Sequence, residues 1–67
     1  MDFVEKASVR LNHWIAHNES HQKEYEEFAA QLEEAGKTAS AVQIREMVAL
    51  AKKGDECLRR AFTALAQ

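Results

Sequence analysis

The chain has 67 residues, of which nine are basic and eleven acidic, and its formal net charge is −2. This mixed composition lacks the concentrated basic face with which proteins usually bind nucleic acid, and no apolar run approaches the roughly 20 residues needed to cross a bilayer. With no signal segment at its start and a single cysteine, Cys57, the sequence predicts a soluble cytoplasmic domain with no membrane or nucleic-acid partner and no internal disulfide.

The first predicted element is a helix over residues 3–35. Proline is absent and there are only two glycines, while residues that favour helices dominate. Asp2 and Glu5 have the spacing of a capping box, and Gly36 stands where a helix commonly ends in a left-handed residue. Between them, apolar or partly apolar residues recur at alternating spacings of three and four. These are Val4, Ala7, Leu11, Trp14, Asn18, His21, Tyr25, Phe28, Leu32 and Ala35.

A turn over residues 36–38 and a second helix over residues 39–66 complete the prediction. Thr38 or Ser40 can cap this helix, and Ser40 with Gln43 repeats the capping-box spacing. The apolar period continues through Ile44, Met47 or Val48, Ala51, Gly54 or Asp55, Leu58, Ala61 or Phe62, and Leu65. Because the connection is short, the helices are expected to be antiparallel neighbours. The predicted fold is all-α, a single helical-hairpin domain over residues 1–67.

The apolar stripe is wider than a strict two-helix seam. It is broadened by Phe3, Val9, Ile15, Val42, Leu50, Cys57 and Ala64. A stripe of this width suits a four-helix bundle more than an isolated pair of helices. We therefore expect a homodimer of hairpins with two-fold symmetry, the commonest oligomer class. A protein partner that supplies the missing helices would satisfy the same requirement.

The middle of the predicted seam is polar. Folding the chain at Gly36 places Asn18 near Asp55, which is expected to accept a hydrogen bond from an imidazole N–H. Gly54 lies at this level in the second helix, where a glycine costs about 1 kcal/mol relative to alanine. This residue is most easily explained if a bulky ring or ligand lies opposite it.

The three histidines of the chain, His13, His17 and His21, fall four residues apart and so share one strip of a helix. The predicted heptad places His21 in the seam, His17 on its shoulder and His13 toward solvent. Neutral imidazole is the commonest nitrogen ligand of transition metals, so these are candidate ligands for Ni, Co, Zn or Fe. Glu24 lies one turn beyond His21 and is a further candidate residue of this site. The alternative is that His21 is a paired core histidine and the other two are partly solvated.

The segment His13-Trp14-x-x-His17-Asn18-x-x-His21-x-x-x-Tyr25 resembles a family of short, largely uncharacterised helical-hairpin domains. Those domains have the pattern H-W-x-x-H-N-x-x-H, followed by an acidic, alanine-rich second helix. The resemblance implies an association with nickel and cobalt handling, and it makes His13, His17, Asn18 and His21 the motif residues. It implies no reaction and no assigned set of ligands.

Three functions remain open from the sequence. The first is a non-enzymatic module with a transition-metal or small-ligand site around His17 and His21, where Asn18, Glu24, Tyr25 and Asp55 would support the rings. The second is a structural or adaptor dimerisation module whose buried polar layer only sets helix register. The third is an enzyme with His21 as general base and Asp55 as orienter. The Glu-x-x-His motif of di-iron carboxylate proteins and the His-Glu-x-x-His motif of zinc proteases are both absent.

Overall fold

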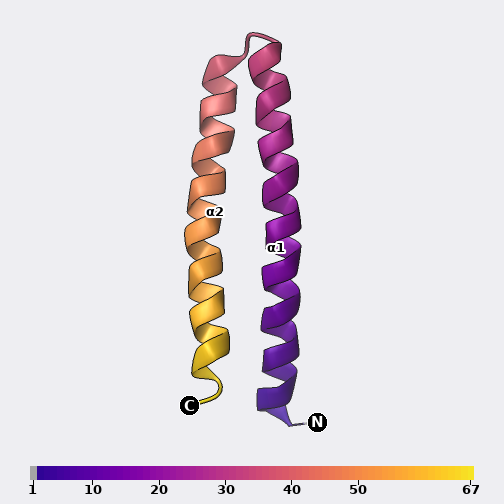
Figure 1. Cartoon of the computed structure of the whole chain (residues 1–67), viewed down its shortest axis with the longest axis vertical. Coiled ribbons are helices and arrows are strands. Elements are labelled where there is room, and N and C mark those ends of the chain that lie inside the picture. The colour runs from indigo at the N-terminus through magenta and orange to yellow at the C-terminus, as the bar shows by residue number, and fades with distance from the viewer. Residues whose placement is uncertain (1) are drawn as a thin grey trace.

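The computed structural model describes residues 2–67, which form two antiparallel helices, α1 (Phe3–Glu34) and α2 (Thr38–Ala64). The molecule measures 51 × 17 × 11 Å, and the start of α1 and the end of α2 lie together, opposite the turn (Figure 1). The predicted all-α hairpin is confirmed. Compared with the predicted ranges, α1 ends one residue earlier, while α2 begins one residue earlier and ends two residues earlier. Neither helix has a stretch that is both long and apolar enough to span a membrane.

The two ends of α1 are capped as the sequence predicts. The Asp2 side chain accepts a hydrogen bond of 2.9 Å from the backbone N–H of Glu5. At the other end, Gly36 adopts a left-handed conformation with a φ of +78°. Its N–H donates to the Glu33 carbonyl at 3.0 Å, and the N–H of Lys37 donates to the Leu32 carbonyl at 2.8 Å. This pair of bonds is a Schellman motif, which requires the positive φ that only glycine adopts without strain.

The start of α2 differs from the prediction. Lys37 is its N-cap residue, no side chain caps the helix, and Ser40 lies inside the first turn. The reason is the tightness of the turn, because Lys37 belongs to both helix ends. Its N–H closes the Schellman motif, and its carbonyl already accepts the N–H of Ala41 at 3.0 Å. No residue is left between the two helices to act as a separate side-chain cap.

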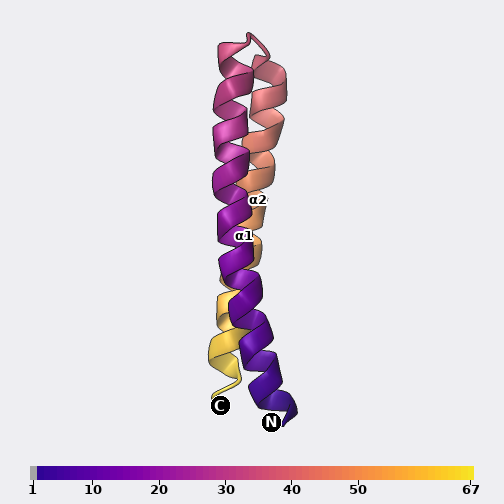
Figure 2. The same ribbon diagram turned by 90° about the vertical axis from the view of Figure 1, so that its right-hand side faces the viewer.

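The helices meet along a regular heptad seam. Its buried and half-buried members are Ser8, Leu11, Ile15, Asn18, Gln22, Tyr25, Ala29 and Leu32 on α1, and Ala41, Ile44, Val48, Ala51, Asp55, Leu58 and Phe62 on α2, followed by Leu65 at its C-cap. A repeat of 3.5 residues keeps such a seam in contact only if the helices wind about each other. Figure 2 shows this winding, since α1 and α2 exchange sides between the turn and the opposite end.

The α1 seam is rotated by one residue from the predicted one. Trp14 and Phe28, which were expected in it, are 46% and 49% exposed, while their neighbours Ile15 and Ala29 are buried. In the same way Gln22 is buried in place of His21, which is half-buried. The physical reason is space. Ile15 and Ala29 are smaller than Trp14 and Phe28, so the helices approach more closely at these two levels when the larger rings lie beside the seam.

Two broad faces flank the seam and differ in chemistry. The charged face is defined by Glu19, Glu26 and Glu33 of α1 and Arg45, Lys52 and Arg59 of α2. The aromatic face is defined by the residues on the opposite flank of the seam, Trp14, His21 and Phe28 of α1 and Met47, Gly54 and Ala61 of α2. Each set advances by seven residues along both helices, so each face runs parallel to the seam.

Candidate functional site

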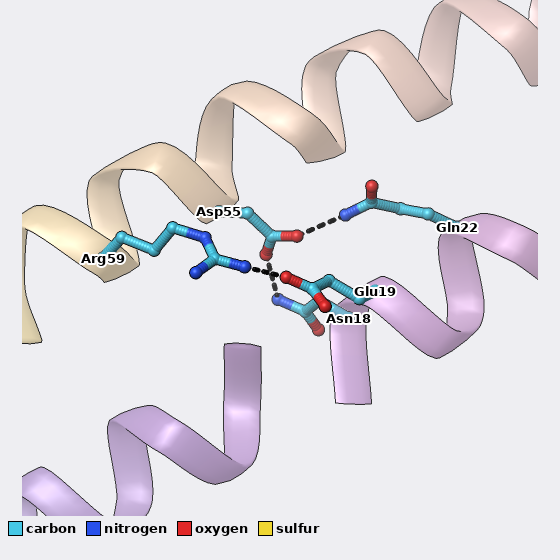
Figure 3. Close-up of polar contacts among 5 residues, drawn as sticks. All are labelled: Asn18, Glu19, Gln22, Asp55 and Arg59. Carbon is cyan, nitrogen blue, oxygen red and sulfur yellow. Dashed lines mark hydrogen bonds and ion pairs between the residues drawn. The ribbon is translucent and has the colours of Figure 1, made fainter. Parts of the chain in front are cut away.

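The most buried polar group of the hairpin is a three-residue layer around Asp55 (Figure 3). Asn18 donates a hydrogen bond of 3.2 Å from Nδ2 to Asp55 Oδ1, and Gln22 donates from Nε2 to the other carboxylate oxygen, Oδ2. Asp55 and Gln22 are only 6% and 7% exposed. Across residues 2–67, no buried side-chain nitrogen or oxygen lacks a partner. The layer is therefore closed, with its donors and acceptors matched inside the hairpin.

This layer corrects part of the sequence prediction. Asn18 and Asp55 lie at one level, as expected, but the partners of Asp55 are two amides and not an imidazole. Gln22 was missed because the one-residue rotation of α1 exchanges it for His21. The signal that identifies it is the acidic repeat of Glu19, Glu26 and Glu33. When Glu19 occupies the flank, the seam positions next to it are one residue before and three residues after, which are Asn18 and Gln22.

The charged face carries three ion pairs between the helices. Arg45 Nη2 lies 2.6 Å from Glu33 Oε2 and Lys52 Nζ lies 3.3 Å from Glu26 Oε1, while Arg59 pairs with Glu19 beside the Asp55 layer (Figure 3). The hydrogen bond and charge of Arg45 hold the pKa of Glu33 below its ordinary value. The pairs are about half exposed, so each contributes little to stability, and their main effect is on pairing geometry.

The three histidines occupy three different environments. His13 and His17 are exposed, whereas His21 is half-buried with 41% of its side chain accessible. The rings of His13 and His17 are stacked, with centroids 5.7 Å apart. The rings of His17 and His21 are closer, at 4.4 Å, and nearly perpendicular. Tyr25 continues the column, 5.9 Å from His21 and stacked on it.

The predicted site residues therefore separate into two groups. Glu24 is near the histidines, since its Oε2 lies 3.5 Å from His21 Nδ1, and Tyr25 stacks beside them. Asn18 and Asp55 instead belong to the closed seam layer. Within residues 2–67, no three side chains of histidine, cysteine, aspartate or glutamate converge as a metal cluster. A single chain thus presents a pair of imidazoles and not a complete coordination shell.

Gly54 faces open space. A Cβ built on it would meet no atom within 4 Å, so nothing inside the hairpin requires a glycine there. No ring of the same chain lies within reach of that Cβ, so of the two expectations, a bulky ring or a ligand opposite Gly54, the ring is not found within the hairpin and the ligand stays a prediction. A mid-helix glycine lowers helix stability by about 1 kcal/mol relative to alanine. Its explanation has to be sought outside this pair of helices.

The aromatic face is grooved at both ends. One groove of about 250 Å³ is lined by Phe3, Lys6, Ala7, Arg10, Leu11 and Trp14. Another, of about 620 Å³, is lined by Phe28, Leu32, Ala39, Ser40, Gln43 and Ile44, from both helices beside the turn. Each groove has an exposed ring of the aromatic face on its wall. Apolar surface of this kind is suited to packing against another helix.

Comparison with known families gives one match. A family model described as a domain of unknown function, DUF8180, matches residues 7–65. The matched segment includes the turn, the Asp55 layer and both faces. Neither the curated proteins nor the solved structures contain a match to the chain. The family match agrees with the resemblance to an uncharacterised short domain, and it names no metal, substrate or partner.

Proposed function

The chain belongs to the DUF8180 family of domains of unknown function, and we propose that it is an assembly module, a hairpin that pairs through its aromatic face with a second copy. The product is an antiparallel four-helix bundle with two-fold symmetry. The module acts by bringing two chains together, and its buried polar layer serves to set the register of its own helices.

The observation that carries this proposal is the exposed apolar surface on one broad face. Trp14, Phe28 and Met47 are 46%, 49% and 39% exposed. On α2, the next row outward also has no charged residue, and consists of Gln43, Leu50, Cys57 and Ala64. A surface that is apolar over several turns marks a contact site, whereas scattered apolar residues do not. Val9 and Val42 are also exposed but lie on the other side, away from the rings of the aromatic face.

The apolar core of the hairpin is small, so a further apolar contact is needed to stabilise it. The buried apolar residues of the described chain are Ile15, Ala29, Ala41 and Val48, and none of its large side chains is fully buried. A domain of this length has difficulty offsetting chain entropy with one small core, and association is one of the usual remedies. Covering Trp14 and Phe28 would add the two largest apolar side chains of the middle of the molecule to the core.

A second copy is the partner that best fits this face. The hairpin measures 51 Å by 17 Å across its broad side, and a contact along most of that length would approach the area of a stable interface, about 800 Å² per partner. The six residues that define the aromatic face carry no charge, and the charged side chains near it, Lys6 and Arg10, line only the groove beside Trp14. A two-fold axis across the helices sets α1 against α1 and α2 against α2 of the second copy, so the rings of the two α1 helices can interleave while Gly54 and Ala61 let the two α2 helices approach.

The closed Asp55 layer favours the assembly function over a ligand site in the seam. Both amide donors and both carboxylate oxygens of this layer are engaged within the hairpin. A single polar layer of this kind specifies register in coiled coils because any other alignment leaves buried groups unpaired. This supports a structural role for the polar layer in the middle of the seam. The histidines are then the polar feature without a role, with His21 on the aromatic face and His17 beside it.

Light scattering of the tag-free protein in chelator tests the proposal. We expect the mass of a dimer at micromolar concentration, and a monomer for the double variant Trp14→Glu/Phe28→Glu. Val9→Glu/Val42→Glu is the matched control, because these valines are equally exposed but lie off the aromatic face. It should remain dimeric. A monomeric wild-type protein, or equal loss of association in both variants, would show the proposal to be wrong, and circular dichroism verifies that each variant is helical.

A further inference from the structure

We propose that His17 and His21 of two paired chains together form a site for one divalent transition-metal ion, with Zn²⁺ as the representative ion. This inference rests on the proposed dimer and adds a ligand to it. The site has four imidazoles, two from each copy, and it lies where the middle of α1 meets its counterpart.

The ring geometry selects this pair of histidines. With metal–nitrogen bonds of about 2.0–2.1 Å, two imidazoles on one tetrahedral ion have ring centres roughly 5 Å apart. The His17 and His21 centroids are 4.4 Å apart with ring planes at 79°, so their nitrogens can converge after a small adjustment. The His13 and His17 rings are 5.7 Å apart and nearly parallel, at 12°, an arrangement in which the ring edges do not converge.

Glu24 supports the orientation of His21. Its carboxylate lies 3.5 Å from His21 Nδ1. Histidine ligands commonly donate the N–H of one ring nitrogen to a carboxylate, which fixes the ring and leaves the other nitrogen to bind the metal. Glu24 therefore acts as a positioning residue for His21, whose Nε2 is the ligand atom. This distance is longer than that of an ideal hydrogen bond, and it is expected to shorten when the metal binds.

The position of the pair along α1 brings two copies of it together. α1 runs from Phe3 to Glu34, and His17 and His21 bracket its midpoint. A two-fold axis along the bundle would set α1 against α2 of the second copy, whereas an axis across the helices sets α1 against α1. If the axis runs across the helices, the midpoints are the levels that coincide. The site therefore requires the axis across the helices, which brings the histidines of both copies to one height on facing helices.

The composition of the site determines the class of ion. One chain supplies two nitrogen ligands, whereas Zn²⁺ usually takes four. Four imidazoles without a thiolate suit the borderline ions Zn²⁺, Ni²⁺, Co²⁺ and Cu²⁺ more than Mg²⁺ or Ca²⁺. Gly54, at about the level of His21 on α2, leaves open space on the same face. That space allows α2 of the second copy to approach, so that the two α1 helices can also meet.

Calorimetric titration of the chelator-treated, tag-free protein with ZnCl₂ tests the site, with elemental analysis of the dialysed complex as a second measurement. We expect one Zn²⁺ for every two chains and a rise of roughly 5–10 °C in melting temperature at saturation. His17→Ala and His21→Ala should each remove the binding, while His13→Ala should retain it. Glu24→Gln should weaken binding by about 10–100-fold, since it removes only the orienting carboxylate.

Failure of this site and failure of the proposed dimer have different signatures. A chelated protein that is dimeric but takes up no Zn²⁺, or that loses as much affinity in His13→Ala as in His21→Ala, overturns the metal site alone. One Zn²⁺ per chain without association also overturns it. A protein that is monomeric in chelator and becomes dimeric with Zn²⁺ retains the metal site and overturns dimerisation driven by the aromatic face. The histidines are on the surface, so loss of folding is not expected in any of these variants.

Discussion

The charged face and the aromatic face are built on the same heptad repeat, yet the side chains of the first find partners within the chain and those of the second do not. On the charged face, each acidic residue of α1 finds a basic residue of α2 in the same chain. On the aromatic face, Trp14 and Phe28 find too little apolar surface in the same chain and remain about half exposed. The first face thus selects which flanks of α1 and α2 come together, and the second leaves a surface for another molecule.

The comparison also shows what the charged face cannot specify. Its charges repeat every seven residues, so sliding α2 by one heptad would still oppose acidic and basic side chains. Asp55 has no such repeat. A slip of seven residues would place its carboxylate opposite Ile15 or Ala29, without an amide donor. The buried layer therefore supplies the register, and the ion pairs supply the choice of flank.

The largest expected effect inside the hairpin comes from Asp55→Ala. It leaves the amides of Asn18 and Gln22 without their acceptor, and an unsatisfied buried polar group costs about 1–3 kcal/mol. Urea denaturation in the Trp14→Glu/Phe28→Glu background measures the loss without a contribution from association. Arg59→Gln, one turn away on the charged face, is the control and should change the free energy of unfolding by roughly 0–1 kcal/mol. Equal losses of unfolding free energy in the two variants would show that the buried Asp55 layer stabilises the hairpin no more than an exposed ion pair does.

Gly54→Ala is expected to stabilise the hairpin and to weaken the dimer. In the monomeric background it should raise the free energy of unfolding by about 1 kcal/mol, because alanine favours the helix and its Cβ meets nothing within 4 Å. In the wild-type background it should raise the dimer dissociation constant, because the Cβ occupies the opening on the aromatic face. Sedimentation equilibrium measures the second effect. A variant that strengthens both hairpin and dimer would show that Gly54 is not part of the contact.

The smallest expected effect is the loss of the Glu33–Arg45 ion pair on the charged face at acid pH. Arg45 lowers the pKa of Glu33, so the pair contributes stability above the ordinary pKa of a glutamic acid, about 4.3, and loses it as the pH falls through the lowered value. NMR titration of the Glu33 carboxyl carbon should show a pKa below that of the same residue in Arg45→Gln. The variant should leave the dimer mass unchanged at neutral pH. An unchanged Glu33 titration would indicate that the pair is not populated in solution.

The sequence predicts the hairpin and its ends but not the rotation of α1. Capping by Asp2 and the left-handed turn at Gly36 depend on single residues with strong local preferences, so they could be recognised directly. The seam could not, because Trp14 and Phe28 have the same helical spacing as Ile15 and Ala29. Ring size favours the first pair when hydrophobicity alone is considered, whereas close approach of two helices favours the second.

The rotation explains why the candidate site was only partly predicted. His21 and Gln22 exchange roles when α1 turns by one residue, which moves the histidine from the polar layer to the aromatic face. The association of Asn18 with Asp55 survives, because Asn18 belongs to the row that both arrangements share. The orientation of the His17 and His21 rings depends on side-chain rotamers, which spacing along the sequence does not determine.

The single turn at Gly36 has a consequence for how the hairpin forms. The ion pairs close loops of increasing length, because their partners are 12, 26 and 40 residues apart for Glu33, Glu26 and Glu19. Loop-closure entropy grows with the logarithm of loop length, so the contacts nearest the turn form with the smallest entropic penalty. Folding is then expected to proceed as a zipper from the turn, with opening from the other end. Amide hydrogen exchange should accordingly become faster along both helices with increasing distance from Gly36.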